Sequence, residues 1–218
     1  MNKFIEIFTW NSNFDTGIPE IDIQHQELVK LLNRLANHLA YHADTPSFDK
    51  VFAELANYAL LHFSTEETIW QQYFTDDEWN RNHGIAHALF IEEVHKIKSQ
   101  QTADNSEEVM ESIVLFLTNW LAVHIIESDR AMASVVSGLQ RGMSLTGAKR
   151  QVNKELDAAN KALIRSILDM CQNLSSKTIS LIKEINHQCS HIFAYPGTNR
   201  AMSACIRSNK DIPVIIAF

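Results

Sequence analysis

The sequence has few cysteines, no cluster of basic residues and no long apolar run. Its three cysteines all lie in the last quarter at wide spacing, which gives neither a disulfide framework nor a zinc motif. A net charge of -7 without a Lys/Arg cluster argues against a nucleic-acid surface. Lys3 and Glu6 interrupt the apolar residues of the N-terminus, which argues against a secretory signal. No apolar run approaches the roughly 18 residues of a membrane span. We therefore expect a soluble, cytoplasmic protein without nucleic-acid or membrane partners.

The composition is that of a globular protein, and residues 1–137 show helical periodicity in four segments. An apolar content of 45% with 21% charged residues is enough to bury a core. Short connections between the segments predict an all-α fold, an antiparallel four-helix bundle of up-down-up-down topology. The four inward-facing stripes are Ile21, His25, Leu28, Leu32, Leu35, Leu39; Val51, Leu55, Tyr58, His62, Glu66, Ile69; His83, His87, Phe90, Val94, Ile97; and Met110, Ile113, Leu117, Trp120, His124.

Five of the ten histidines occupy stripe positions that would ordinarily hold Leu or Ile. A single such histidine is more often a core residue with a hydrogen-bond partner. Counting residues from the expected helix ends, however, brings all five to one level: His25 falls opposite residue 63, and His83 and His87 fall opposite residues 119–123. One layer of the predicted core therefore holds five imidazoles and the carboxylate of Glu66.

A metal centre would resolve the cost of burying so many polar groups, which is several kcal/mol for each unpaired one. His62 and Glu66 are four residues apart on one helix face, as are His83 and His87, so each pair can converge on one ion. A nitrogen-rich set with carboxylates suits iron, manganese or zinc better than magnesium or calcium. The remaining histidines, His38 and His42 among them, carry no constellation of this kind.

Asp129 is harder to place, because it follows His124 by five residues. At 100° per residue it lies about 140° round the helix from His124. It continues the flank of Leu121 and Ile125, from which we expect it to reach sideways into the same layer.

These residues resemble the hemerythrin-like domains, which are di-iron oxygen binders. The resemblance spans roughly residues 8 to 137 and rests on WNxxFxxGIPEIDxQHxxL from Trp10, HFxxEE from His62, HxxxHxxF from His83 and WLxxHxxxxD from Trp120. It implies two non-haem irons with an oxo or hydroxo bridge, held by His25, His62, Glu66, His83, His87, His124 and Asp129.

By this resemblance, His25 and His62 would ligate one iron and the other three histidines its neighbour, while Glu66 and Asp129 bridge both. At one iron, three imidazoles, two bridging carboxylates and a solvent bridge fill all six coordination positions. At the iron of His25 and His62, two imidazoles and the same three bridges fill five positions and leave one open for O2. The family's oxygen pocket is expected at Phe63, Trp120, Leu121 and Ile125, although ordinary core packing explains Phe63 equally well.

The region after residue 137 needs a separate interpretation. Glycines at 138, 142 and 147 predict a linker over 138–147, and an apolar stripe from Val152 to Ile185 predicts a long amphipathic helix over 148–190. The stripe's step of about 3.67 residues favours self-association as a coiled coil, giving a homodimer, over packing against the outside of the bundle. Residues 191–218 show no interpretable pattern.

Two functions remain open at this point. The first is reversible O2 binding, as a carrier, store or sensor, without enzymatic activity. The second is a di-iron oxidase or iron-handling protein of ferritin-like type, which typically uses four carboxylates and two histidines with E-x-x-H pairs. The predicted layer has two carboxylates and five histidines, which favours the first. A metal-free helical interaction protein would require five aligned core histidines by coincidence.

Overall fold

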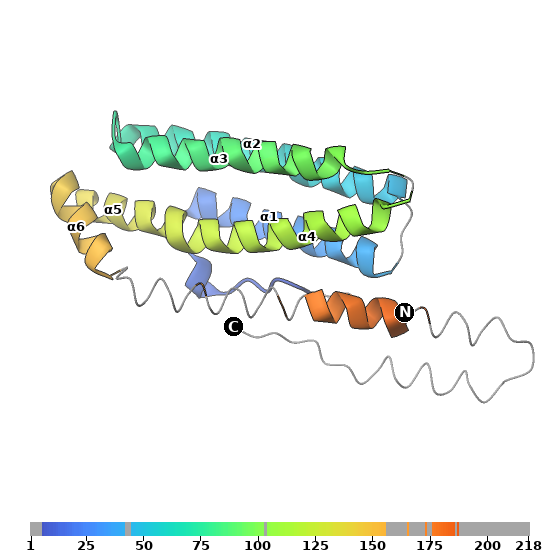
Figure 1. The fold of residues 1–218 in the computed structure, drawn as a ribbon. Helices are drawn as coiled ribbons and strands as arrows, with labels where there is room; N and C mark the ends of the chain where they lie inside the picture. The colour runs from blue at the N-terminus through green and yellow to red at the C-terminus, as the bar shows by residue number, and fades with distance from the viewer. Residues whose placement is uncertain are drawn as a thin grey trace, which may run out of the picture.

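In a computed structural model, the protein is a bundle of α-helices (Figure 1). The structure describes residues 6–41, 45–102, 104–155, 165, 173, 176–185 and 187. The bundle helices are α1 (Pro19–Ala40), α2 (Thr45–Tyr73), α3 (Glu78–Ser99) and α4 (Ser106–Val123), preceded by a short 3-10 turn, η1 (Ser12–Phe14). α4 runs through the segment η2 (His124–Asp129) into α5 (Arg130–Gln140), and α6 (Leu145–Glu155) follows. The all-α class expected from the periodicity is confirmed, and the described residues contain no strand.

The helices begin and end where the local chemistry favours it. Pro19 stands at the first turn of α1, where its missing N–H costs nothing. The Asp77 carboxylate accepts a 2.8 Å hydrogen bond from the Trp79 N–H and so caps α3. Glu107 and Glu108 lie in the first turn of α4, where negative charge is favourable. These signals set where the helices begin, and with a constant rise per residue they fix the level at which each polar residue lies.

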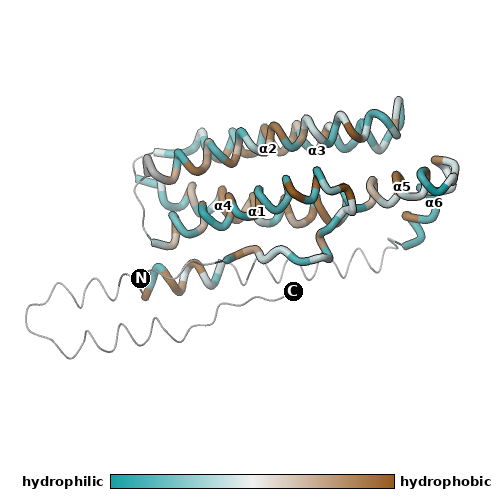
Figure 2. Tube along the Cα trace, turned by 180° about the vertical axis from the view of Figure 1, so that it is seen from behind, coloured by the Kyte–Doolittle hydropathy of each residue, from teal (hydrophilic) through white to brown (hydrophobic). Residues whose placement is uncertain are grey.

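The bundle closes because each helix buries one face against two neighbours. α1 contacts α2 and α4, and α3 contacts α2 and α4. Hydrophobic and hydrophilic residues are interspersed along the bundle helices, as expected for amphipathic helices that bury one face (Figure 2). Leu32, Leu35 and Ile113 are among the fully buried side chains of the resulting core. Burying one such side chain contributes roughly 1.5–3 kcal/mol, so the core supplies the rigidity against which a polar layer can be held.

The segment between α4 and α5 is a turn of π-helix, which the sequence did not reveal. In η2 the hydrogen bonds join residues five apart, so His124 and Asp129 lie on the same face. The expectation that Asp129 reaches in sideways from a flank is therefore wrong. That expectation assumed an α-helical rotation of 100° per residue throughout the segment. The π-turn instead accommodates one additional residue between His124 and Asp129. Such turns are rare and occur frequently at functional sites.

The continuous helix Ser106–Gln140 is long and apolar enough to cross a membrane by length and composition. The sequence has no uninterrupted apolar run here, so the apolar character of this helix was not predicted. However, 56% of the most apolar stretch is buried inside the protein. Packing within the bundle therefore accounts for much of its apolar character.

α6 folds back onto the bundle after a tight turn. Gly142 adopts φ +89°, a conformation that L side chains rarely adopt, and ends the helix that passes through Gly138. A Cβ on Gly138 would lie 3.0 Å from that of Ala148, so glycine allows α5 and α6 to approach closely. The break between helices, at residues 141–144, is shorter than the linker predicted over 138–147.

The described part of the chain beyond α6 lies against the bundle. Residues 176–185 are helical, Ile179 is fully buried in the main core cluster, and Ile182 packs on the same cluster (Figure 1). Lys183 pairs with Glu107 and Glu111 at 3.0 and 3.1 Å, and Arg165 approaches Glu127 at 3.4 Å. Since higher residue numbers in this segment meet lower ones in α4, the two run antiparallel.

This packing replaces the predicted self-association, which finds no support. Ile179 is the residue of this segment that is buried in the main core cluster. The predicted apolar stripe instead contained Thr178, Leu181 and Ile185. Leu181 is 62% exposed, so the buried face differs from the predicted one. Most of the predicted helix 148–190 between Glu155 and residue 176 lies outside the described residues, as does all of 191–218.

We expect Ile179→Ala to destabilise the protein by about 2–5 kcal/mol, the usual cost of truncating a buried isoleucine. If residues 176–185 detach before the bundle unfolds, the lost stability will appear as faster proteolytic cleavage after residue 155. Leu181→Ala removes a similar side chain from an exposed position and should change stability by less than about 0.5 kcal/mol. Chemical denaturation and limited proteolysis measure both effects. Equal behaviour of the two variants would contradict the docked arrangement.

Candidate metal centre

The seven side chains singled out by the sequence meet in one buried layer. His25 comes from α1, His62 and Glu66 from α2, His83 and His87 from α3, and His124 and Asp129 from η2. None is more than 5% exposed, and His25, Glu66 and Asp129 are completely buried. Among the described residues, they form two groups that could each hold a metal ion. These groups are Glu66, His83, His87 and His124, and His25, His62, Glu66 and Asp129.

Each carboxylate presents one oxygen to each group of histidines. Glu66 Oε1 lies 3.7 Å from His25 Nε2 and 3.5 Å from His62 Nε2, while its Oε2 lies 3.2 Å from His87 Nε2. Asp129 Oδ2 lies 3.2 Å from His25 Nε2, and its Oδ1 lies 2.9 Å from His83 Nε2. Both carboxylates therefore stand between a group of two imidazoles and a group of three.

The distances within the group of three imidazoles are those of a coordination shell. His124 Nε2 lies 3.0 Å from both His83 Nε2 and His87 Nε2, and 3.2 Å from Asp129 Oδ1. Two metal–nitrogen bonds of about 2.1 Å at a right angle would place their nitrogens about 3.0 Å apart. One Nε2 cannot satisfy three such neighbours by hydrogen bonding, so a cation at their centre explains the spacing better.

Several buried polar atoms of the layer have no hydrogen-bond partner within the described part of the chain. These are both carboxylate oxygens of Glu66, Oδ2 of Asp129, both ring nitrogens of His25 and Nδ1 of His83. Native proteins leave few buried polar groups unpaired, because each costs about 1–3 kcal/mol. Carboxylate oxygens and imidazole nitrogens that converge without hydrogen bonds fit a bound metal, which would satisfy most of them at once.

The charges of the layer depend on one another. Burial favours a neutral His25, but the carboxylates of Asp129 and Glu66 outweigh it and raise the pKa of His25 to about 9. Burial lowers the pKa of His62 and of His83 to about 4, so both are neutral and able to ligate. Burial opposes ionisation of Glu66 as well, yet the surrounding histidines hold its pKa well below the ordinary value. Burial also opposes the charge of His87, but hydrogen bonding to Glu66 outweighs burial and raises the pKa of His87. The layer thus offers an ionised carboxylate at Glu66 and neutral imidazoles at His62 and His83.

Two residues outside the predicted set orient the histidines. Gln24 Oε1 lies 3.0 Å from His62 Nδ1, and the Gln24 amide donates a hydrogen bond to Thr65 Oγ1. Glu67 Oε1 lies 3.1 Å from His87 Nδ1. Such bonds fix the ring and leave Nε2 free for a metal. Their sequence signal is weak, because each is a polar residue on a helix flank next to a predicted ligand.

We expect Gln24→Ala to lower iron affinity by about 10–100-fold, as loss of an outer-shell partner generally does. The His62 ring would lose the acceptor for its Nδ1 proton and part of its fixed orientation. Gln26→Ala is the matched control, since Gln26 lies on the same helix but makes no contact with a histidine of the layer. Competition with a coloured chelator measures both affinities. Equal affinities would show that Gln24 does not position His62.

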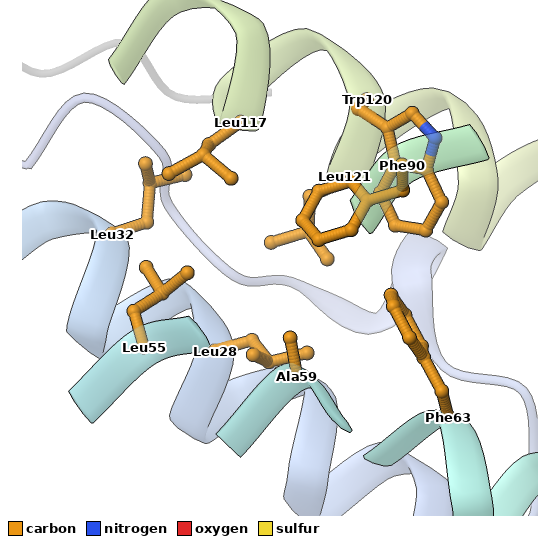
Figure 3. Close-up of a pocket in the computed structure, with 9 residues that line it drawn as sticks. All are labelled: Leu28, Leu32, Leu55, Ala59, Phe63, Phe90, Leu117, Trp120 and Leu121. Carbon is orange, nitrogen blue, oxygen red and sulfur yellow. The ribbon is translucent and has the colours of Figure 1, made fainter. Parts of the chain in front are cut away.

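An apolar cavity of about 20 Å³ lies one turn from the layer (Figure 3). Figure 3 shows side chains from all four bundle helices pointing into it, among them Leu28, Ala59, Phe63, Trp120 and Leu121. Of the four predicted pocket residues, Ile125 is fully buried in the core but does not line this cavity. The space is enough for one small molecule.

Aromatic rings separate the cavity from the imidazoles. The Phe63 ring stacks on His87 at 3.9 Å between centroids, and Trp120 stacks on His124 at 4.2 Å. Phe63 and Trp120 also meet edge to face at 5.6 Å. These contacts exclude water from one side of the layer while leaving a small apolar space beside it.

Histidines outside the layer take no part in it. Within the described residues, His38, His95 and His187 lie outside both ligand groups, and His95 and His187 are exposed. His42 and His191 lie outside the described residues.

Sequence comparisons agree with this geometry. The hemerythrin HHE cation binding domain matches residues 16–136, more than half of the chain. The chain belongs to the hemerythrin family. The all-helical fold and the buried cluster of histidines and carboxylates are consistent with the iron binding of hemerythrins.

Individual hemerythrin relatives match over a similar length. A bacteriohemerythrin of Pseudomonas aeruginosa is 32% identical over 137 residues, which cover 62% of this chain and 83% of that protein. A bacteriohemerythrin of Clostridium acetobutylicum is 27% identical over 132 residues, covering 57% of this chain and 97% of its own. A hemerythrin-like protein of Naegleria gruberi is 27% identical over 130 residues, covering 59% and 93%. No solved structure matches the chain significantly.

Proposed function

We propose that this protein binds O2 reversibly at a centre of two non-haem irons joined by an oxo or hydroxo bridge. The observation that carries the proposal is the pair of buried carboxylates, each of which turns one oxygen to the group of two imidazoles and the other oxygen to the group of three. The iron pair, when bound, supplies the electrons that hold O2. The seven ligands are His25, His62, Glu66, His83, His87, His124 and Asp129.

The two groups of ligands differ in their number of imidazoles, and this difference indicates at which ion O2 would bind. Glu66 belongs to both groups, and Asp129 Oδ1 also lies beside His83 and His124. With both carboxylates shared, one ion would have three imidazoles and the other only those of His25 and His62. The second ion therefore has fewer protein ligands and more room for O2. Leu28 follows His25 by three residues, and Ala59 precedes His62 by three residues. Both line the apolar cavity. The cavity supports entry or retention of O2 on that side.

The protein environment favours binding over further reaction. Phe63 and Trp120 cover His87 and His124, and the cavity one turn from His25 and His62 has an apolar lining, so few proton donors reach the layer from this side. Protonation and release of reduced oxygen would require such donors. A layer with five imidazoles and two carboxylates also differs from the carboxylate-rich centres of ferritin-like oxidases. We therefore infer a carrier, store or sensor of O2 rather than an enzyme.

The decisive experiment follows the optical spectrum of the reduced, iron-loaded protein through cycles of air and deoxygenation. Reversible binding should give a charge-transfer band that appears with O2 and disappears on deoxygenation over several cycles. An irreversible change with consumption of O2 would instead support a di-iron oxidase. Metal analysis of the same sample should give two irons per chain. A protein that takes up no iron would refute both alternatives.

A further inference from the structure

The N-terminal segment, residues 6–17, is attached to α1 at two points, and most of it precedes the residues 16–136 that match the family. The first attachment is the side-chain amide of Asn33. Its Oδ1 accepts hydrogen bonds from the N–H groups of Ile7 and Phe8 at 2.9 and 3.0 Å, and its Nδ2 donates one to the Phe8 carbonyl at 2.7 Å. Asn33 is only 5% exposed, so water competes little for these bonds.

The second attachment is the carboxylate of Asp22. Its Oδ1 accepts hydrogen bonds from the N–H and the hydroxyl of Thr16, both at 2.7 Å, and its Oδ2 accepts one from the Gly17 N–H at 3.1 Å. Along α1, Asp22 precedes His25 by three residues and Asn33 follows it by eight. The N-terminal segment is therefore held on both sides of His25 and passes its level.

Trp10 is the residue that this segment places beside His25. The two rings lie 5.9 Å apart between centroids. His25 is completely buried, whereas Trp10 is half-buried and its Nε1 donates a 3.2 Å hydrogen bond to the exposed carboxylate of Asp15. The buried ring of Phe14 packs on the indole at 5.5 Å. The indole therefore stands between a buried imidazole of the metal layer and the surface.

We propose that Trp10 covers the His25 side of the metal layer and keeps water and small anions away from it. Asn33 and Asp22 act through Trp10, as positioning residues, since they hold the two ends of its segment. An apolar shell of this kind controls the access of solvent to a metal site. The consequence for O2 rests on the proposed function, which places the open coordination position on the ion of His25 and His62.

Diethyl pyrocarbonate, a small reagent that acylates imidazole nitrogens, measures access to His25 in the full-length, metal-free protein. Peptide mass spectrometry gives the rate of modification of each histidine separately. We expect Trp10→Ala and Asn33→Ala each to raise the rate at His25 several-fold. The rate at His87, which is covered by the Phe63 ring, should stay that of the unmodified protein. A loss of packing throughout the bundle would instead raise both rates.

Two further variants separate the cover from a general effect of losing a tryptophan. Trp10→Phe keeps an apolar ring and should restore the protection of His25. Trp79→Ala removes another half-buried indole, which lies 4.9 Å from Lys149 Nζ, and should leave the rate at His25 unchanged. An unchanged rate at His25 in Trp10→Ala, or an equal rise at His87, would overturn the proposal. Full protection of His25 in Asn33→Ala would refute the positioning role.

The iron-loaded, oxidised protein gives a second readout, with azide as the probe. Azide should bind several-fold faster to Trp10→Ala than to the unmodified protein, while the absorption spectrum at saturation stays the same. Equal rates would refute the link between the cover and the open position. Because the acylation experiment contains no metal, a failure to bind iron would refute the proposed function while leaving the cover result intact.

Discussion

Glu66→Ala should abolish binding of the iron pair. Glu66 is completely buried and its two oxygens serve both groups of histidines, so no solvent ligand can replace it without opening the core. Loss of an outer-shell partner costs about 10–100-fold in metal affinity, and loss of a shared direct ligand should exceed that. We expect the iron content to fall from two per chain toward zero, with no O2-dependent absorption band.

Two neighbouring substitutions show whether the effect is specific to Glu66. Glu67→Ala removes the exposed carboxylate that contacts His87 Nδ1, and should weaken iron binding while preserving the stoichiometry at saturation. Glu92→Ala removes an exposed carboxylate from α3 and should bind iron like the unmodified protein. Metal analysis and circular dichroism on all three separate loss of iron from loss of fold. A Glu66→Ala protein with full iron content would refute the proposed bridge.

The fold was predictable from the sequence because its helices carry local signals as well as periodicity. Thr45-Pro46-Ser47 combines a capping residue type with proline in the first turn, and the structure begins α2 at Thr45. Asp77 is likewise a residue type that favours the helix N-terminus, and it caps α3. With the helix ends fixed, a constant rise per residue is enough to bring His25, His62 and His83 to one level.

Features that depend on tertiary contacts could not be predicted in this way. The apolar residues of the C-terminal extension lie on more than one face, so only the shape of the bundle decides that Ile179 is buried and Leu181 is not. Gln24 and Glu67 stand in the quoted motifs, but their roles could not be assigned from the sequence, because each contacts a histidine on a neighbouring helix. The π-turn replaces α-helical hydrogen bonds locally, and helical periodicity gives no reason to expect it.

That π-turn leads to the second large effect. In a regular α-helix, residue 128 would lie close to the face of His124, about 40° away, and residue 129 would lie about 140° away. In η2 the order is reversed: Asp129 is completely buried beside His124, while Ser128 is half-buried and lines a polar pocket of about 210 Å³ that His83 also borders. The double variant Ser128→Asp/Asp129→Ser moves the carboxylate by one residue and leaves the composition unchanged. It distinguishes the two helical geometries directly.

We expect both Asp129→Ala and the transposed variant to lose iron, because the transposed carboxylate would enter the polar pocket and leave the space between His25 and His83 empty. Glu127→Ala is the control, since Glu127 belongs to the same turn but faces Arg165. Iron stoichiometry and the O2-dependent band measure the outcome. Full iron binding by the transposed variant would mean that the segment can wind as an ordinary α-helix, and the five-residue interval between His124 and Asp129 would then have no role in building the centre.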